Sequence, residues 1–489
     1  MSNLQKARNY IEENKFKVDP EYRQKYHVMG EIGWINDPNG FCMYKEEYHL
    51  FYQYHPYSSE WGPMHWGHVK SKDLIKWDHL PVALAPDSTF DASGCFSGSA
   101  IEKDGELYLM YTGHLDPDPG NPANIRQVQN IARSKDGIEF EKLATNPVIG
   151  SKDAPDYTMP QDFRDPKVFL RGDYYYTVIG ARHKDKSGQV LLYKSKDLLE
   201  WEYVGELARS EHKIGDIWEC PDVFPMEGED VLIISPQFLE KEGEKYSNMH
   251  SSLYLVGKLD LETGKYDYHT MDQIDDGFDF YAPQTLEDNR GRRIMIAWMN
   301  MWERNNPTNT QNHNWAGAMT LPRELKMING KLYQIPVDDI KQYRINPVTY
   351  KDISVLDKVV LEGVQGQHIE LEIEIDALQA KNFGLSILKN NKQETKLYYN
   401  REESKFVFDR SNSGQEIDQD NVRKTIIPLY DNILKLRVFI DRSSVEVFMQ
   451  EGERVMSATV YPDSDAAGIE FFADQEIIIR RINKWDIEV

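Results

Sequence analysis

The sequence predicts an all-β protein, a five-bladed β-propeller followed by a C-terminal β-sandwich. Three observations support this prediction: a motif that recurs about every sixty residues, a second motif series at similar spacing, and alternating strands near the C-terminus. The 489 residues exceed one ordinary domain, and the 12% content of aromatic residues is typical of β structure. Rings of this kind also stack on sugar faces, so the composition is compatible with carbohydrate binding.

The recurring motif is a short SKD segment that marks each repeat. It reads SKDLIKW at 71–77, SKDGIEF at 134–140 and SKDLLEW at 195–201, so its copies begin 63 and 61 residues apart. A weaker copy lies near Asp260. Runs with strand character, such as EYHLFYQY and ELYLMYTG, fill the intervals and are separated by turn residues. One repeat can hold four short strands with their loops, which is the content of a large propeller blade.

The second series places a polar or acidic residue just before an apolar strand in each repeat. Its members are NDPNGF at Asp37, FSGSAI at Ser97, RDPKVF at Asp165, ECPDVF at Glu219 and YAPQTL at Pro283. Five members predict five blades. Because the innermost strand of every blade lies next to the propeller axis, residues at the same strand end should converge on one pocket.

The ends of the chain differ from this repeat. Leu4, Ala7 and Ile11 have helical spacing and predict a short amphipathic helix. In HIELEIEID, from His368 to Asp376, apolar residues alternate with glutamates that we expect on the solvent face, as in a half-buried strand. We therefore divide the chain into a helical extension at 1–30, a propeller at 31–335, a short helical linker at 336–348 and a β-sandwich at 349–489.

The charge and the cysteine content exclude several classes of partner. A net charge of -23 argues against nucleic acid, which would be repelled. No stretch approaches the roughly 18 apolar residues of a membrane span, and the charged N-terminus does not resemble a signal peptide. Cys42, Cys95 and Cys220 form no disulfide pattern. We expect a cytoplasmic protein with no nucleic-acid or membrane partner, and nothing in the sequence indicates its oligomeric state.

Three acids in the second series have different neighbours. Asp37 lies in WINDPNG, whose turn residues predict a tight turn rich in donors that would keep the carboxylate ionised. Asp165 follows Arg164, which favours the charged form. Glu219 follows Trp218 and precedes a cysteine, an apolar setting that would raise a carboxyl pKa and suit a general acid. Two carboxyls with separated pKa values are what glycoside hydrolysis requires.

WINDPNG, FRDPKVF and WECPDVF, in this order, resemble the three acidic motifs of glycoside hydrolase family 32, the family of invertases, fructan hydrolases and sucrose-6-phosphate hydrolases. Further similar segments are LFYQYHP, WGPMHWGH, FSGSA, FDFYAPQT, AWMNMW, WAGAMTLPREL and, near the C-terminus, DRSSVEVF. The resemblance covers about residues 30–450 and implies the same propeller and sandwich that the repeats predict.

The resemblance also implies an activity and a set of residue roles. It implies a retaining β-fructofuranosidase that hydrolyses sucrose, sucrose 6-phosphate or short fructo-oligosaccharides and can transfer fructose to other sugars. Asp37 is the implied nucleophile, Glu219 the implied acid/base and Asp165 the implied transition-state stabiliser, and retention requires about 5–5.5 Å between the first two carboxyls. The residues implied to line the pocket are Asn36, Gln53, Trp61, Phe96, Ser97, Arg164, Tyr281 and Trp298.

We predict no cofactor and no metal. The histidines at 49, 55, 65 and 68 lack an acid at metal-ligand spacing and are expected to be structural or to contact sugar. His55 stands where many relatives have Asn, and we assign it no role. Cys220 is expected to pack against Glu219.

Two alternatives and one question of substrate stay open at this level. An inverting, arabinanase-like propeller would hold its carboxyls about 6.5–9.5 Å apart, and a non-catalytic sugar-binding propeller could dispense with Glu219. Recognition of a phosphorylated sugar needs a local basic cluster, for which Lys45, His114 and Arg126 are candidates.

Overall fold

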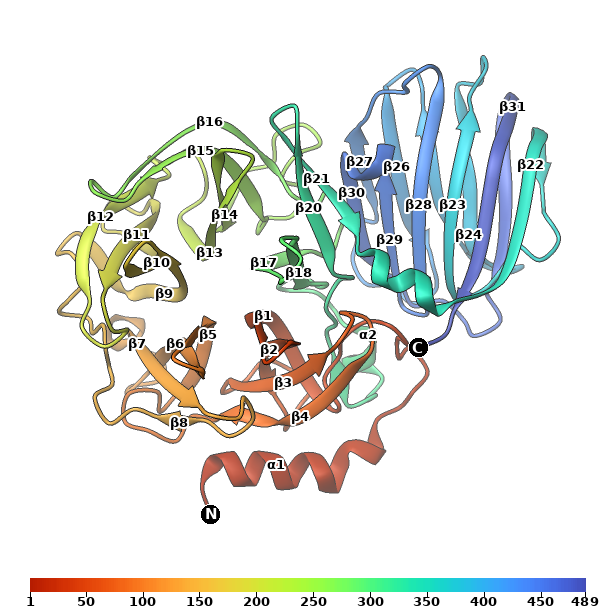
Figure 1. Ribbon diagram of the computed structural model, residues 1–489. Helices are drawn as coiled ribbons and strands as arrows, with labels where there is room; N and C mark the ends of the chain where they lie inside the picture. The colour runs from red at the N-terminus through yellow and green to blue at the C-terminus, as the bar shows by residue number, and fades with distance from the viewer.

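The computed structural model describes residues 1–489 and consists of a propeller with a β-sandwich at its side (Figure 1). Each of the five blades is an antiparallel sheet. The innermost strands of successive blades contact one another in a closed ring, in which the last blade meets the first. The five-bladed propeller that the repeats predict is confirmed. No helix has the length and apolar character needed to cross a membrane.

The blades follow one another in chain order, from the innermost strand outward. Blade 1 contains β1 (Gly33–Tyr44), β2 (Glu47–His55), β3 (His65–Ser71) and β4 (Trp77–Leu84). Blade 2 contains β5 (Gly94–Lys103), β6 (Glu106–Leu115), β7 (Arg126–Ser134) and β8 (Glu141–Lys142). Blade 3 contains β9 (Thr158–Arg171), β10 (Tyr174–His183), β11 (Gly188–Ser195) and β12 (Glu202–Arg209). Blade 4 contains β13 (Ile217–Met226), β14 (Glu229–Gln237), β15 (Leu253–Asp260) and β16 (Lys265–Gln273). Blade 5 contains β17 (Tyr281–Glu287), β18 (Arg293–Trp298), β20 (Arg323–Ile328) and β21 (Lys331–Pro336).

The SKD motif forms the turn between the third and fourth strands of a blade. In each copy the aspartate side chain accepts hydrogen bonds from two backbone N–H groups two and three residues further on, at Asp73, Asp136 and Asp197. Asp260 makes the same pair of bonds between β15 and β16. The weak fourth copy of the motif is therefore a turn of the same kind in blade 4.

All five innermost strands carry a β-bulge at the same level. The pairing register with the second strand shifts by one residue in each of them. The residues at these bulges are Asp37, Ser97, Asp165, Cys220 and Ala282. Asp165, Cys220 and Ala282 adopt the left-handed backbone conformation, with φ of 65°, 45° and 51°. A bulge bends a strand and redirects its side chains. Each motif of the second series therefore contains a bulge in the innermost strand of its blade.

The turn predicted for residues 34–40 is wrong, because WINDPNG lies within β1. Its turn-forming residues occupy two bulges, one between Ile35 and Pro38 and one between Asn39 and Cys42. A proline has no N–H to donate and is tolerated in a strand at a bulge. Proline and asparagine thus interrupt the ladder here without ending the strand.

Two residues beyond each bulge, a buried polar side chain bonds to the next blade. Asn39 accepts the N–H of Gly98, and Ser99 bonds to the backbone on both sides of Lys167. Asp222 accepts the N–H of Thr285 at 2.7 Å. In the remaining two blades, Lys167 pairs with Asp222 at 2.9 Å, and Gln284 bonds to the backbone of Phe41 and Gly98. These bonds join the five inner strands, whose inner edges pair with no other strand apart from the start of β1.

The N-terminal helix α1 (Asn3–Asn14) packs against β4 with Ala7 and Ile11 buried. Ser2 accepts the N–H of Gln5 and caps it. The short elements η1 (Lys15–Lys17), η2 (Pro122–Asn124) and α2 (Pro307–Thr310) lie in loops. The two-residue strand β19 (Trp315–Ala316) pairs in parallel with the start of β1.

The segment predicted as a linker contains η3 (Asp338–Tyr343) and the start of the first sandwich strand. The sandwich strands are β22 (Arg344–Val359), β23 (His368–Asp376), β24 (Asn382–Lys389), β25 (Glu394–Asn400), β26 (Lys405–Asn412), β27 (Val422–Ile426), β28 (Ile433–Asp441), β29 (Ser444–Met449), β30 (Arg454–Thr459) and β31 (Gly468–Ile487), with η4 (Gln450–Gly452) before β30. The long strand β31 pairs with β24 near its start and with β23 near its end, so it joins both layers.

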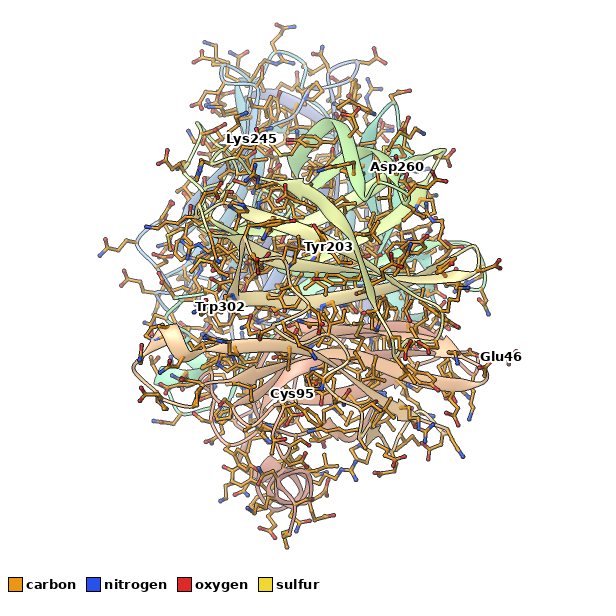
Figure 2. The ribbon with its side chains drawn as sticks, turned by 90° about the vertical axis from the view of Figure 1, so that its left-hand side faces the viewer. Glu46, Cys95, Tyr203, Lys245, Asp260 and Trp302 are labelled. Atoms are coloured by element: carbon orange, nitrogen blue, oxygen red, sulfur yellow. The ribbon has the colours of Figure 1, made fainter.

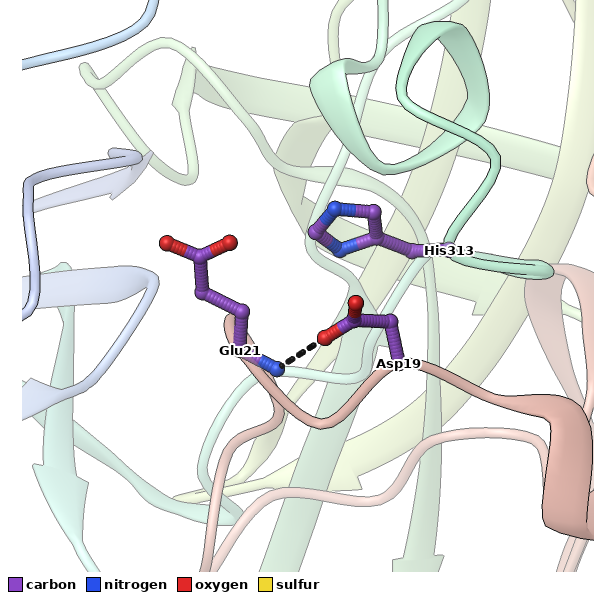
Figure 3. A group of neighbouring side chains, drawn as sticks. All are labelled: Asp19, Glu21 and His313. Atoms are coloured by element: carbon purple, nitrogen blue, oxygen red, sulfur yellow. Dashed lines mark hydrogen bonds between the residues drawn. The ribbon is translucent and has the colours of Figure 1, made fainter.

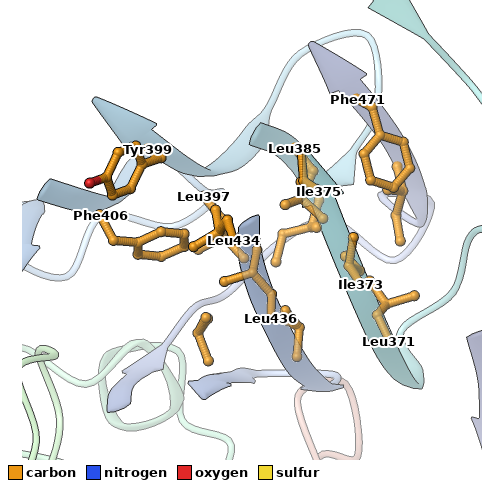
Figure 4. Packing of buried hydrophobic residues seen from close by; sticks show 14 of the residues in the cluster. Leu371, Ile373, Ile375, Leu385, Leu397, Tyr399, Phe406, Leu434, Leu436 and Phe471 are labelled. Atoms are coloured by element: carbon orange, nitrogen blue, oxygen red, sulfur yellow. The ribbon is translucent and has the colours of Figure 1, made fainter. Parts of the chain in front are cut away.

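The core of the sandwich is a cluster of 35 buried residues between the layers. Figure 4 shows Leu371 and Ile373 of β23 among the apolar side chains of this core. The predicted alternation is confirmed for these residues. The expectation of solvated glutamates fails at Glu370, which is buried and ion-paired with Arg344 and Arg437.

A buried charge network joins the propeller to the sandwich. His27 lies between Asp441 at 2.8 Å and Glu446 at 3.0 Å. Glu446 also pairs with Arg323 of blade 5, which pairs with Asp275. Burial disfavours a charged His27, but its bonds to the two carboxylates outweigh this and raise its pKa to about 9. All these side chains are fully or almost fully buried.

This network predicts that the protein loses stability as the pH rises through about 9. The folded pKa of His27 lies above the value of about 6.5 in an unfolded chain, so its stabilisation is complete below pH 6.5 and disappears above pH 9. The expected loss is on the order of 3 kcal/mol. Calorimetric Tm values between pH 6 and pH 10 measure it.

The matched variants are His27→Gln and His212→Gln, since His212 is an exposed histidine. The first should lower Tm at neutral pH and flatten the alkaline decline, whereas the second should reproduce the wild-type profile. An equally steep decline in His27→Gln would show that another group causes it.

Candidate active site

A cavity of about 810 Å³ opens at one face of the propeller, and Asp37, Asp165 and Glu219 all line it. They come from the innermost strands of blades 1, 3 and 4. Trp302 also lines this cavity. Figure 2 shows Trp302 and Glu46 on opposite faces of the propeller disc. The structure therefore brings the three acids together, as the spacing of the second motif series predicts.

Asp37 is buried and has one strong donor. Its Oδ2 accepts a hydrogen bond from the Ser97 hydroxyl at 2.7 Å, and its Oδ1 has no partner in the protein. Burial and then the negative charge of Glu219 raise the pKa of Asp37 to about 6. The donors around Asp37 lower its pKa as the sequence predicts but do not outweigh burial, and a pKa of about 6 leaves the carboxylate mostly ionised at pH 7.

Two hydrogen bonds, each with a backbone N–H as the donor, hold Asp165 at its bulge. Its N–H donates to the Thr112 hydroxyl at 2.9 Å, and its Oδ2 accepts the N–H of Cys220 at 3.0 Å. Burial and the charge of Glu219 raise the pKa of Asp165 to about 7, although Arg164 acts in the opposite direction. The influence expected from Arg164 is real but smaller than these two effects.

Glu219 lies in a polar setting, not the apolar one predicted from its sequence neighbours. Arg164 contacts its Oε1 with two nitrogens at 2.9 Å. Its Oε2 accepts hydrogen bonds from Gln237 and from the Tyr281 hydroxyl, both at 2.6 Å. Trp218 packs into the hydrophobic core of blades 3 and 4, because consecutive residues of a strand point to opposite faces.

Cys220 lies between two of the acids. Its Sγ is 3.7 Å from Oδ2 of Asp37 and 3.6 Å from Oδ2 of Asp165, and these contacts replace the predicted packing against Glu219. Burial raises the pKa of the thiol, so Cys220 stays protonated and acts as a weak donor to both carboxylates.

The predicted lining residues fall into two groups. Those that line the cavity are Asn36, Gln53, Trp61, Phe96, Ser97 and Arg164. Tyr281 and Trp298 do not line it, so the prediction is wrong for both. Tyr281 is buried and reaches the cavity only through its bond to Glu219. Trp298 is fully buried, with its ring centre 5.0 Å from that of Trp302, which faces the cavity in its place.

Several residues of the cavity wall are not predicted from the sequence: Asp116, Gln127, Asp162, Arg182, Gln237 and Trp302. Asp162 could have been found, since it precedes Arg164 by two residues on the same strand and pairs with it at 2.9 Å. Arg182 lies at the end of β10 and has no sequence signal of its own. Its Nη2 is 3.3 Å from Asp216, and its Nε has no hydrogen-bond partner.

Of the basic residues considered for phosphate, only His114 lines the cavity. It stacks on Phe96, and burial followed by the charge of Arg164 lowers its pKa to about 4, so it is neutral at pH 7. Arg126 donates to the carbonyls of Ala123 and Ile125. Lys45 does not line the cavity, and its ammonium group donates to the carbonyl of Lys135 at 2.7 Å.

The four histidines of blade 1 make structural contacts. His49 and His68 form a buried hydrogen-bonded pair at 3.0 Å. The rings of His55 and His65 both contact the carbonyl of Pro63, at 3.3 and 3.0 Å. None of the four belongs to a group that could hold a metal ion.

Comparison with known proteins identifies the family. The profile of the glycosyl hydrolases family 32 N-terminal domain matches residues 27–336, and that of the family 32 C-terminal domain matches residues 339–486. The chain is 38% identical to the sucrose-6-phosphate hydrolase of Escherichia coli over 98% of this chain and 97% of that protein. It is 37% identical to the raffinose invertase of Escherichia coli, over 92% and 91%.

The structure of a family 32 β-fructofuranosidase from Bombyx mori, a mutant of which was solved with sucrose, superposes with a TM-score of 0.86 at 34% identity, over 99% of this chain and 98% of that one. This chain belongs to glycoside hydrolase family 32.

Proposed function

We propose that this protein is a retaining β-fructofuranosidase that hydrolyses the terminal fructosyl bond of sucrose, sucrose 6-phosphate or short fructo-oligosaccharides. The observation that carries the proposal is the convergence of Asp37, Asp165 and Glu219 on one cavity in a chain of family 32. The relatives named sucrose-6-phosphate hydrolase and raffinose invertase support sucrose-type substrates.

In the first step Asp37 attacks C2 of the fructosyl unit. Its unpartnered Oδ1 is the oxygen free to form the bond, while Ser97 holds Oδ2. Glu219 gives a proton to the departing glycosidic oxygen, so the leaving sugar departs as a neutral alcohol. The product of this step is a covalent fructosyl-enzyme with its ester at Asp37.

In the second step Glu219 removes a proton from water, and the water oxygen attacks C2. The ester bond to Asp37 breaks and fructose is released with its original configuration. Any sugar hydroxyl in place of the water gives transfer of fructose. Asp165 remains close to the fructosyl unit in both steps, where its carboxylate can bind hydroxyls and stabilise positive charge on the ring.

Glu219 must give a proton in the first step and take one in the second, and its contacts hold it in position for both. Arg164 and Tyr281 orient the carboxyl from opposite oxygens. Burial and the negative charge of Glu219 raise the pKa values of the two neighbouring acids, Asp37 and Asp165, toward neutrality.

The cavity walls fit a sugar in other respects. Trp61 and Phe96 offer aromatic faces to C–H groups, and Asn36 and Gln53 offer polar side chains to hydroxyls. The inverting arabinanase-like alternative and the non-catalytic alternative are not favoured in a family 32 chain that has all three acids. A cytoplasmic location stays a prediction, supported by three cysteines that form no disulfide.

Arg182 is the residue most suited to bind a phosphate on the leaving sugar. Of the two arginines that line the cavity, Arg164 is held by Glu219 and Asp162 at 2.9 Å, whereas Arg182 makes only longer contacts, with Asp216 at 3.3 Å and Asp162 at 3.9 Å. A guanidinium binds phosphate through paired hydrogen bonds.

Glu219→Gln should reduce kcat/KM for sucrose by roughly a hundredfold to ten-thousandfold, because the amide cannot protonate the leaving oxygen. Activated aryl fructosides, whose leaving groups need little protonation, should lose much less. Steady-state kinetics on both substrates measure this difference, and equal losses would contradict the acid/base role of Glu219.

The pH profile of the same variant tests the charge coupling in the site. Asp37 must be ionised to attack, so kcat/KM for an aryl fructoside should fall as the pH drops through about 6. Glu219→Gln removes a negative charge that raises the pKa of Asp37, so this acid limb should move to lower pH. An unmoved or raised limb would mean that another group limits the rate.

Asp37→Asn should abolish the covalent intermediate. Rapid acid quenching of wild-type protein with an aryl fructoside, followed by mass spectrometry, should reveal a fructosyl adduct that the variant lacks. Asp165→Asn provides the control, since it keeps the proposed nucleophile. An adduct in Asp37→Asn would assign the attack to another residue.

Arg182→Gln should lower kcat/KM for sucrose 6-phosphate by about 10- to 100-fold and change that for sucrose little, because it removes one charge-assisted contact. Arg209→Gln is the matched control, as Arg209 is a nearby arginine outside the cavity wall. Equal losses on both substrates would rule out phosphate recognition by Arg182.

A further inference from the structure

A group of three possible ligands lies outside the active site, where the N-terminal segment crosses blade 5. Asp19, Glu21 and His313 each offer one ligand atom, and these atoms lie within 4.8 Å of one another (Figure 3). The two carboxylates are exposed, whereas His313 is only 4% exposed. None of the three lines the cavity of the three acids.

His313 provides the second observation that points to a ligand. Its Nδ1 is buried and has no hydrogen-bond partner. Figure 3 shows the ring directed toward the carboxylate of Asp19, with Glu21 beside it. A buried ring nitrogen without a partner is unfavourable, and a cation shared with the two carboxylates would satisfy it.

The backbone holds the three residues in place. The N–H of Asp19 donates to the carbonyl of His313 at 3.1 Å, and the N–H of Glu21 donates to Oδ1 of Asp19 at 2.9 Å. The ring of Tyr22 stacks on His313 with centres 5.4 Å apart and planes 10° apart. The ring position is thus fixed from two directions, and the site needs little ordering before it binds an ion.

The carboxylates are free to complete the site. The only cation paired with Glu21 is Arg442, at 3.9 Å, which is too long for a hydrogen bond. Nitrogen and carboxylate oxygens bind zinc at about 2.0–2.2 Å, so ligand atoms around one ion lie nearer to one another than 4.8 Å. The exposed side chains of Asp19 and Glu21 can move this short distance.

We propose that Asp19, Glu21 and His313 bind a divalent transition-metal ion, with Zn²⁺ as the representative ion, and that water completes its coordination. A mixed nitrogen and oxygen ligand set favours such ions over Mg²⁺ and Ca²⁺, which prefer oxygen ligands alone. The prediction of no metal considered the histidines of blade 1 and did not consider His313.

The ion would join two segments next to the closure of the propeller. His313 precedes Asn314, whose carbonyl accepts the N–H of Gly33 at 2.8 Å, and β19 pairs with β1 directly after it. Asp19 belongs to the segment between η1 and β1. Binding should therefore stabilise the folded chain and leave kcat/KM unchanged.

The experiment uses full-length protein treated with EDTA and then dialysed. Calorimetric titration with ZnCl₂ should reveal a saturable site, and Tm should rise by about 2–5 °C at saturation. Asp19→Asn, Glu21→Gln and His313→Gln should each weaken this site by about tenfold or more. Excess MgCl₂ should not displace the ion.

Glu13→Gln is the matched control, because Glu13 is an exposed acid of α1 with the same change of charge. It should bind Zn²⁺ like the wild type. Glu21→Gln changes an exposed side chain and should fold normally, so it decides the question if His313→Gln does not fold. Absence of saturable binding in the wild type, or equal affinity in Glu21→Gln, would overturn the proposal.

Discussion

The positions of the three acids depend on how the propeller satisfies the backbone of its inner strands. Each inner strand pairs with the second strand of its own blade, and its other edge pairs with no strand except at the start of β1, which pairs with two residues of β19. Buried Asn39, Ser99, Asp222 and Gln284 bond to backbone groups of adjacent blades, and Lys167 bonds to Asp222. Unpaired backbone groups at this depth would be costly. The bonds that remove this cost also fix the distance between blades, and hence between the acids.

This constraint explains what the sequence could and could not predict. Each motif of the second series has a bulge residue and, two positions later, a cross-blade residue, so its spacing predicted both the blades and the convergence of Asp37, Asp165 and Glu219. WINDPNG was misread as a turn because residues that form turns also form bulges. Trp298 and Tyr281 lie one layer deeper than predicted, since a motif gives a position along a strand and not its depth. Arg182 lies outside every motif and depends on tertiary structure alone.

Electrostatics in the cavity follow from the same geometry. Burial raises the pKa of both Asp37 and Asp165, and the charge of Glu219 raises them further. Arg164 is the one guanidinium among the three acids, and it contacts Glu219 while its neighbour Asp165 points elsewhere. The β-bulge at Asp165 redirects its side chain relative to that of Arg164, so the arginine next to one acid in sequence binds another acid in space. Because the site has more carboxyls than cations, the negative charge of Glu219 adds to burial in raising the pKa values of Asp37 and Asp165.

The sandwich and the N-terminal segment help to hold the ring of five blades closed, although they lie away from the cavity. The four antiparallel strands of every blade follow one another in the chain, apart from β19, which lies between β18 and β20 in sequence and adds only a two-residue parallel pairing to the sheet of blade 1. Blade 5 and blade 1 must therefore be held together by other means. β19 pairs with β1, and one hydrophobic cluster contains Ile11 of α1, Ile35 of β1, Ile296 of β18 and Phe448 of the sandwich. His27 and Arg323 link the same region to the sandwich through Glu446. Loosening this closure would separate the blade of Asp37 from the blade that supplies Tyr281 to Glu219, and so would change the relative positions of two proposed catalytic groups.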